Sequence, residues 1–160
     1  TAKLAAEEQA GLHRFPGFGT PAPEPIALRG ADDLNPANIS VLHHGGELLA
    51  LWEGGSAYRL DPVTLATLGR KSWHEDLEGV AFSAHPKREP NGTLWNFGDA
   101  LNQGALVIYH IGANGQLRNA GTVSVADLGM VHDFVVTARH LVFVISPLAY
   151  DRVRSGSFVP

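Results

Sequence analysis

The 160-residue sequence contains no cysteine, which excludes a disulfide framework, metal ligation by thiolates and a cysteine nucleophile. No apolar run approaches the roughly 20 residues that a transmembrane helix requires, and no signal peptide is recognisable from Thr1 onward. We therefore expect a cytoplasmic protein. Peripheral contact of the full-length protein with a membrane is left open.

Basic residues are few as well, with 12 lysines and arginines against 16 acidic residues and a formal net charge of -4. They form no basic block, so nucleic acid is not expected as a partner. The Gly-x-Ser-x-Gly motif of serine hydrolases is also missing. Glycine and proline, in contrast, are plentiful at 18 and 10 residues, and this favours a loop-rich β protein over a helical one.

A pattern that repeats about every 47 residues places two histidines at equivalent positions. His85 precedes the β-like run at Leu94 by nine residues, and His132 precedes the run at Leu141 by nine residues. A third copy of the run begins at Glu47. A period of about 40 to 50 residues with several strands per unit is typical of a β-propeller, in which equivalent positions of successive blades converge on the axis. The two imidazoles therefore predict part of a metal site.

The chain divides into two parts. Residues 1–38, with closely spaced glycines and prolines, predict an irregular connecting segment. Residues 39–160 predict an all-β partial propeller with blades at about 39–70, 80–124 and 131–160, the last one incomplete. Strands are expected at residues 39–44, 47–53, 57–60, 65–68, 80–84, 93–97, 106–111, 116–123, 134–137 and 141–146. Because a propeller has about four to eight blades, we expect a fragment whose open edges need the missing blades or another chain.

Glu53 is predicted to lie at the same end of the sheet as the two histidines. A hairpin that turns at Gly45 and Gly46 places Glu53 across from Asn38, close to the repeat position of the histidines. A carboxylate there can bind a metal, or accept a hydrogen bond from the second ring nitrogen of a ligand histidine. A solvated or ion-paired surface glutamate is the alternative. Surface or hydrogen-bonded structural roles are expected for the remaining histidines, which are His13, His43, His44, His74, His110 and His140.

The two histidines lie in the motifs SAHPK (residues 83–87) and VHDF (residues 131–134). Further motifs are NIS at 38–40, LALWEGG at 49–55 and LDPVTLAT at 60–67. Their ordered combination, over roughly residues 35–148, resembles the carotenoid cleavage oxygenase family. That family includes bacterial apocarotenoid and lignostilbene oxygenases and the vertebrate retinal-pigment-epithelium isomerase.

The resemblance implies a seven-bladed propeller with Fe(II) on its axis, held by four histidines, three of which are oriented by glutamates. His85 and His132 match two of these ligands, and Glu53 matches the glutamate that supports His132. The other histidines and glutamates are expected downstream of Pro160. The implied reaction is cleavage of a C=C bond of a carotenoid, apocarotenoid or stilbene by O₂ into two carbonyl products, with this chain inactive alone. Substrate-binding residues are not identified.

Two other functions are compatible with a propeller. One is a non-catalytic binding scaffold, which the metal content of the full-length protein would separate from an oxygenase. The other is a metal-dependent hydrolase or lactonase, which would need more oxygen ligands than Asp133 and Glu53 supply.

Overall fold

The computed structural model describes residues 5–6, 9–11, 31–33, 35–100, 103–146, 149–151 and 157–159. Most of the connecting segment expected at residues 1–38 lies outside these ranges. The described part consists mainly of antiparallel strands, with a short 3₁₀ helix, η1 (Glu75–Leu77), between the first two sheets. None of the described helices is long and apolar enough to cross a bilayer.

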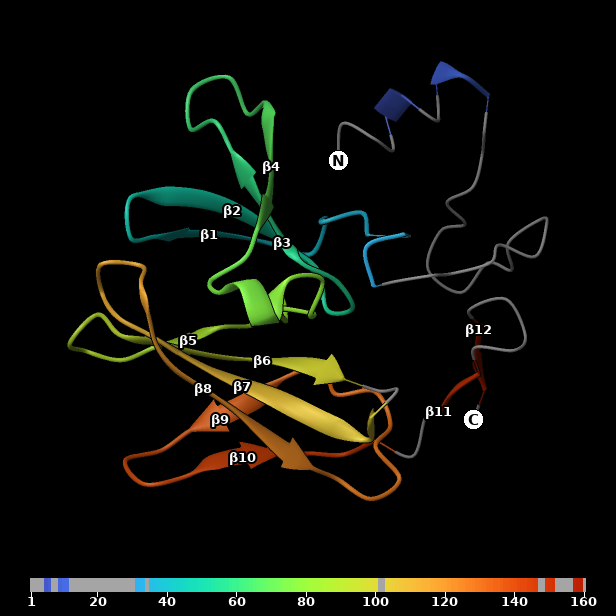
Figure 1. Cartoon of the computed structure of the whole chain (residues 1–160), viewed down its shortest axis with the longest axis vertical. Helices are drawn as coiled ribbons and strands as arrows, with labels where there is room; N and C mark the ends of the chain where they lie inside the picture. The colour runs from blue at the N-terminus through green and yellow to red at the C-terminus, as the bar shows by residue number, and fades with distance from the viewer. Residues whose placement is uncertain are drawn as a thin grey trace.

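The first sheet has four antiparallel strands in chain order (Figure 1). They are β1 (Ser40–His44), β2 (Glu47–Leu51), β3 (Ala57–Leu60) and β4 (Thr67–Lys71). The hairpin of β1 and β2 turns at Gly45 and Gly46, whose φ angles of 58° and 82° favour glycine. Ser40 therefore pairs with Leu51, as the predicted register requires.

The fourth strand begins later than predicted. The sequence predicted a strand at residues 65–68, but β4 starts at Thr67. The Asp61 carboxylate accepts hydrogen bonds from the backbone N–H groups of Val63 and Thr64, at 3.0 and 2.7 Å, and so extends the turn. Leu65 then adopts a left-handed conformation with φ 59°, which is incompatible with a strand.

The second sheet repeats the same order. Its strands are β5 (Lys87–Arg88), β6 (Leu94–Ala100), β7 (Ala105–Ile111) and β8 (Leu117–Ser124). The strand predicted at residues 80–84 is wrong, because neighbouring N–H groups of this segment bond to two different places, the loop between β2 and β3 and strand β6. Phe82 N–H donates to Gly55 O at 2.9 Å, whereas Ser83 N–H donates to Phe97 O at 2.8 Å. A Cβ at Gly98 would overlap the carbonyl oxygen of Ala81, so glycine is needed for this close approach.

The remaining strands form two short pairs. β9 (Phe134–Val136) pairs with β10 (Leu141–Phe143), and both are shorter than the predicted strands at 134–137 and 141–146. β11 (Ala149–Asp151) pairs with β12 (Ser157–Val159), where the sequence predicted no strand. Among the described residues this second pair is a separate sheet from β9 and β10.

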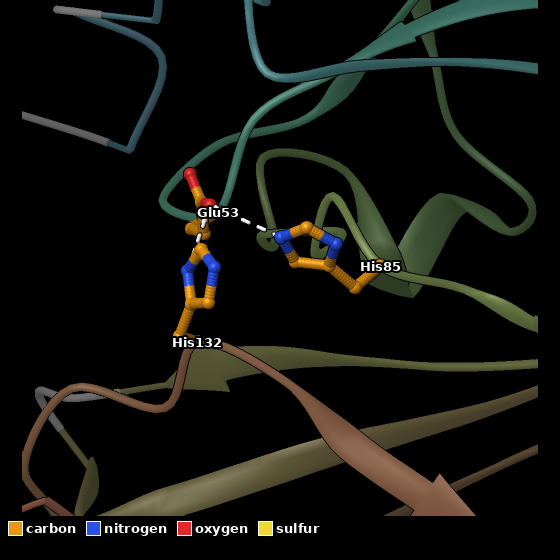
Figure 2. Close-up of side chains that lie close together, drawn as sticks. All are labelled: Glu53, His85 and His132. Carbon is orange, nitrogen blue, oxygen red and sulfur yellow. Dashed lines mark ion pairs between the residues drawn. The ribbon is translucent and has the colours of Figure 1, made fainter.

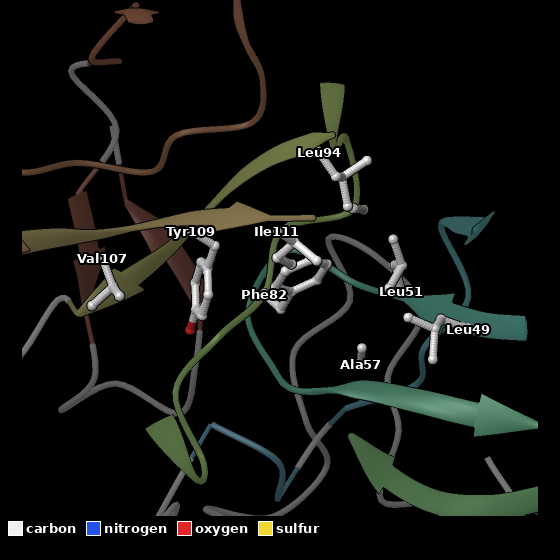
Figure 3. Close-up of a cluster of buried hydrophobic side chains, with 9 residues drawn as sticks. Leu49, Leu51, Ala57, Phe82, Leu94, Val107, Tyr109 and Ile111 are labelled. Atoms are coloured by element: carbon white, nitrogen blue, oxygen red, sulfur yellow. The ribbon is translucent and has the colours of Figure 1, made fainter. Parts of the chain in front are cut away.

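Two apolar clusters lie between neighbouring sheets. The larger joins the first two sheets and contains Leu49, Leu51, Ala57, Phe82, Ala84, Leu94, Val107, Tyr109 and Ile111 (Figure 3). Phe82 stacks on Trp73 with ring centres 4.1 Å apart, and Tyr109 donates its hydroxyl to Ala81 O at 3.0 Å. The smaller cluster, Phe97, Leu106, Val131 and Phe134, joins the second sheet to β9. This packing fixes the loops of successive sheets relative to one another.

Candidate metal centre

Three side chains from separate segments converge on one small volume (Figure 2). Glu53 lies just after β2, His85 just before β5 and His132 just before β9. One ligand atom from each lies within 4.8 Å of the others. The two imidazole rings have their centres 4.4 Å apart at an interplanar angle of 62°. The convergence that the repeat predicted is therefore present.

Glu53 is the innermost member of the group, with a side chain only 11% exposed. Its Oε1 lies 3.1 Å from Nδ1 of His132 and 3.7 Å from Nε2 of His85. The shorter distance suits a hydrogen bond from a neutral imidazole, whose other nitrogen, Nε2, then carries the lone pair that a metal needs. The side chain of His132 is 62% exposed, so this nitrogen is accessible.

His85 provides the test of whether a metal fits. Its Nε2 is buried and has no hydrogen-bond partner in the described part of the chain. A buried polar nitrogen without a partner costs free energy, and a bound cation would remove that cost. Two imidazoles with a carboxylate beside them are a donor set that suits divalent first-row metals such as iron. The residues present therefore fit a metal ion.

Asp99, near the end of β6, is a neighbour of this group that the sequence analysis missed. Burial raises its pKa to about 7, the hydrogen bond from the Val131 backbone N–H opposes the rise, and the charge of Glu53 adds to it. Its Oδ1 is buried without a partner among the described residues. The available signal was an acidic residue inside an otherwise largely apolar strand.

The stability of the metal-free protein is expected to fall as the pH rises from about 4 to about 7. Over this range the unfolded chain releases the Asp99 proton while the folded protein retains it, so ionisation favours unfolding. The difference between 3.8 and about 7 corresponds to about 4 kcal/mol. Asp99→Asn should remove this dependence, measured by thermal melting at pH 5 and 8. Asp127→Asn, which removes an exposed carboxylate, is the control, and equal pH slopes for wild type and Asp99→Asn would contradict the prediction.

Most other histidines in the described ranges have structural partners. Nε2 of His44 lies 2.8 Å from Gly112 O, and His110 stacks on Trp95 at 4.1 Å. His74 accepts a hydrogen bond from the Asp76 backbone N–H at the start of η1. His13 lies outside the described residues.

Comparison with known proteins shows to which family the chain belongs. Residues 1–158 match the family described as retinal pigment epithelial membrane protein. The chain belongs to this family. This match, together with the oxygenase relatives described next, confirms the resemblance to the carotenoid cleavage oxygenases.

Relatives in the family are oxygenases of several kinds. The chain is 35% identical over 126 residues to resveratrol cleavage oxygenase 1 of Aspergillus fumigatus, covering 75% of this chain and 25% of the relative. It is 31% identical over 151 residues to isoeugenol monooxygenase of Pseudomonas nitroreducens, covering 92% and 31%. With apocarotenoid-15,15'-oxygenase of Synechocystis it shares 30% identity, covering 86% and 31%. The chain thus spans between a quarter and a third of the length of these relatives.

Solved structures of family members share the fold. Lignostilbene dioxygenase of Pseudomonas brassicacearum gives a TM-score of 0.78 at 29% identity, covering 97% of this chain and 33% of that structure. Cobalt-substituted apocarotenoid oxygenase of Synechocystis gives 0.79 at 26% identity, covering 97% and 36%. The predicted fold class is confirmed: the chain is all-β and forms part of a β-propeller.

Proposed function

We propose that the protein containing this chain is a non-haem Fe(II)-dependent dioxygenase that cleaves a C=C bond of a carotenoid, apocarotenoid or stilbene. The observation that carries the proposal is the convergence of His85, His132 and Glu53 within 4.8 Å. Its support comes from relatives named as cleavage oxygenases of resveratrol and of carotenoids, as an apocarotenoid oxygenase and as a lignostilbene dioxygenase. In the reaction, one O₂ molecule gives one oxygen atom to each alkene carbon, and two carbonyl products result.

In this proposal each of the three side chains has a distinct task. His85 presents to the metal its buried Nε2, which has no hydrogen-bond partner among the described residues. Glu53 holds Nδ1 of His132 at 3.1 Å, which orients the ring and leaves Nε2 for the metal. Iron, when bound, supplies a site at which O₂ is activated next to the alkene. The two further histidines that the family resemblance implies would come from outside this chain.

The donor set favours an oxygenase over the two alternatives. A propeller hydrolase or lactonase would need mainly oxygen ligands, whereas the group found here has two ring nitrogens and one carboxylate. In a scaffold without a metal, the buried Nε2 of His85 would have no hydrogen-bond partner in the part of the chain that the structure describes. The expected cytoplasmic location, with or without peripheral membrane contact, is part of the proposal and is testable by cell fractionation.

The direct test uses the full-length protein purified without oxygen. We expect about one iron per polypeptide, and cleavage of an apocarotenal or a hydroxylated stilbene into two carbonyl products when O₂ is admitted. With ¹⁸O₂, both products should carry label before exchange with water. Protein that retains no iron, or that retains iron and hydrolyses a lactone while leaving both alkenes intact, would overturn the proposal.

A further inference from the structure

A second contact joins the two histidine-bearing segments. Nζ of Lys87, two residues after His85, lies 2.7 Å from Oδ1 of Asp133, the residue directly after His132. The two side chains are 34% and 49% exposed. The ion pair therefore spans the same gap between segments as the proposed metal, one or two residues farther along each chain.

One end of this ion pair lies in a sheet and the other lies directly before a strand. Lys87 belongs to β5, whose ladder pairs it with Trp95 of β6. Oδ1 of Asp133 also accepts the backbone N–H of Phe134 at 2.7 Å. Phe134 is only 3% exposed, and Nζ of Lys87 lies 5.7 Å from its ring centre. The pair consequently connects β5 to the residue that precedes β9.

The ion pair lies next to the two histidines along both segments. Lys87 reaches Asp133 at 2.7 Å and the His85 ring centre lies 4.4 Å from that of His132, so both side chains face the segment that carries His132. The contact between Glu53 and His85 is longer, at 3.7 Å, and His85 Nε2 has no hydrogen-bond partner among the described residues. Glu53 alone therefore fixes His132 better than it fixes His85.

We propose that Lys87 and Asp133 are positioning residues whose ion pair sets the separation of His85 and His132 for metal binding. This inference rests on the proposed function, since it assumes that the histidines bind a metal. Metal sites need their ligands held within about 0.5 Å of the productive geometry. An ion pair between side chains of the two segments, adjacent to the ligands, would hold the ligands at a constant separation.

The chain offers a matched control for the test. Nζ of Lys71 lies 2.6 Å from Oε2 of Glu47 and 5.6 Å from the ring centre of Trp73. The side chains of Lys71 and Glu47 are 20% and 31% exposed. This pair has the same chemistry as Lys87 and Asp133 but lies within the first sheet, between β2 and β4, and joins neither of the segments that carry His85 and His132. An effect of ion-pair loss on general stability should appear at both pairs.

The experiment compares Lys87→Met, Asp133→Asn and the double variant in the full-length protein. Metal-free protein is titrated with Co²⁺, and affinity is read from the visible absorption of the bound ion. We expect each single change to weaken affinity about threefold to tenfold, below the effect of a buried partner because the pair is half-exposed. The double variant should lose no more affinity than the single variant with the larger loss, because the two residues act as one unit. Lys71→Met and Glu47→Gln should change affinity less than twofold.

Several outcomes would overturn the inference. Wild-type affinity in both single variants, or equal loss in the Lys71 and Glu47 controls, would show an ordinary surface ion pair. Additive losses in the double variant would show two independent effects. Wild-type protein that binds neither Co²⁺ nor Fe(II) would instead overturn the proposed function and this inference with it. If Lys87→Met fails to fold, Asp133→Asn carries the test, since asparagine keeps an oxygen for the Phe134 N–H.

Discussion

Replacement of His85 or His132 by alanine in the full-length protein is expected to abolish iron retention and alkene cleavage. Each change removes one of the two ring nitrogens that the described residues offer to the metal. Loss of a partner that only supports a ligand already costs about 10- to 100-fold, so loss of a ligand should exceed about 100-fold in affinity. Iron analysis after gel filtration and a single-turnover cleavage assay measure both effects.

Stability separates this result from simple unfolding. In the metal-free protein, His85→Ala removes a buried nitrogen that has no hydrogen-bond partner among the described residues, so its melting temperature should not fall below that of the wild type. His140→Ala is the matched control, because this exposed histidine bonds to Thr137 through its backbone and not its ring. Normal iron content in either His85→Ala or His132→Ala would refute the metal assignment.

Glu53→Gln is expected to lower metal affinity or turnover about 10- to 100-fold. Glutamine has nearly the same shape and can still accept a hydrogen bond from Nδ1 of His132, but it lacks the negative charge that makes the imidazole a better donor to the metal. The carboxylate is only 11% exposed, so water screens this charge weakly. Co²⁺ titration and cleavage rates measure the effect.

The control for Glu53 is Glu78→Gln. The Glu78 side chain is 72% exposed and its contact with Arg70 is long, at 3.7 Å, so affinity and rate should remain within twofold of wild type. Unchanged iron content and turnover in Glu53→Gln would show that the glutamate only fills space beside the histidines.

The sequence by itself determined the features that depend on neighbouring residues. Two glycines at 45 and 46 set the register of β1 and β2, because the turn geometry is local. That register brought Glu53 to the end of the sheet. The spacing of His85 and His132 from Leu94 and Leu141 is also reproduced, since those leucines begin β6 and β10. One ligand-bearing segment per repeat could therefore be predicted without knowing how the sheets pack.

Only the tertiary structure decided what depends on contacts between distant segments. Residues 80–84 are apolar enough for a strand, but the N–H of Phe82 bonds to Gly55 in the loop after β2, whereas the N–H of Ser83 bonds to Phe97 in β6. Asp99 carries a raised pKa because packing buries it and brings it near Glu53. Lys87 and Asp133 are 46 residues apart in sequence and meet only because the tertiary fold brings the residue before β9 next to β5. Pairing energies of this kind depend on which groups are desolvated together, and sequence spacing does not contain that information.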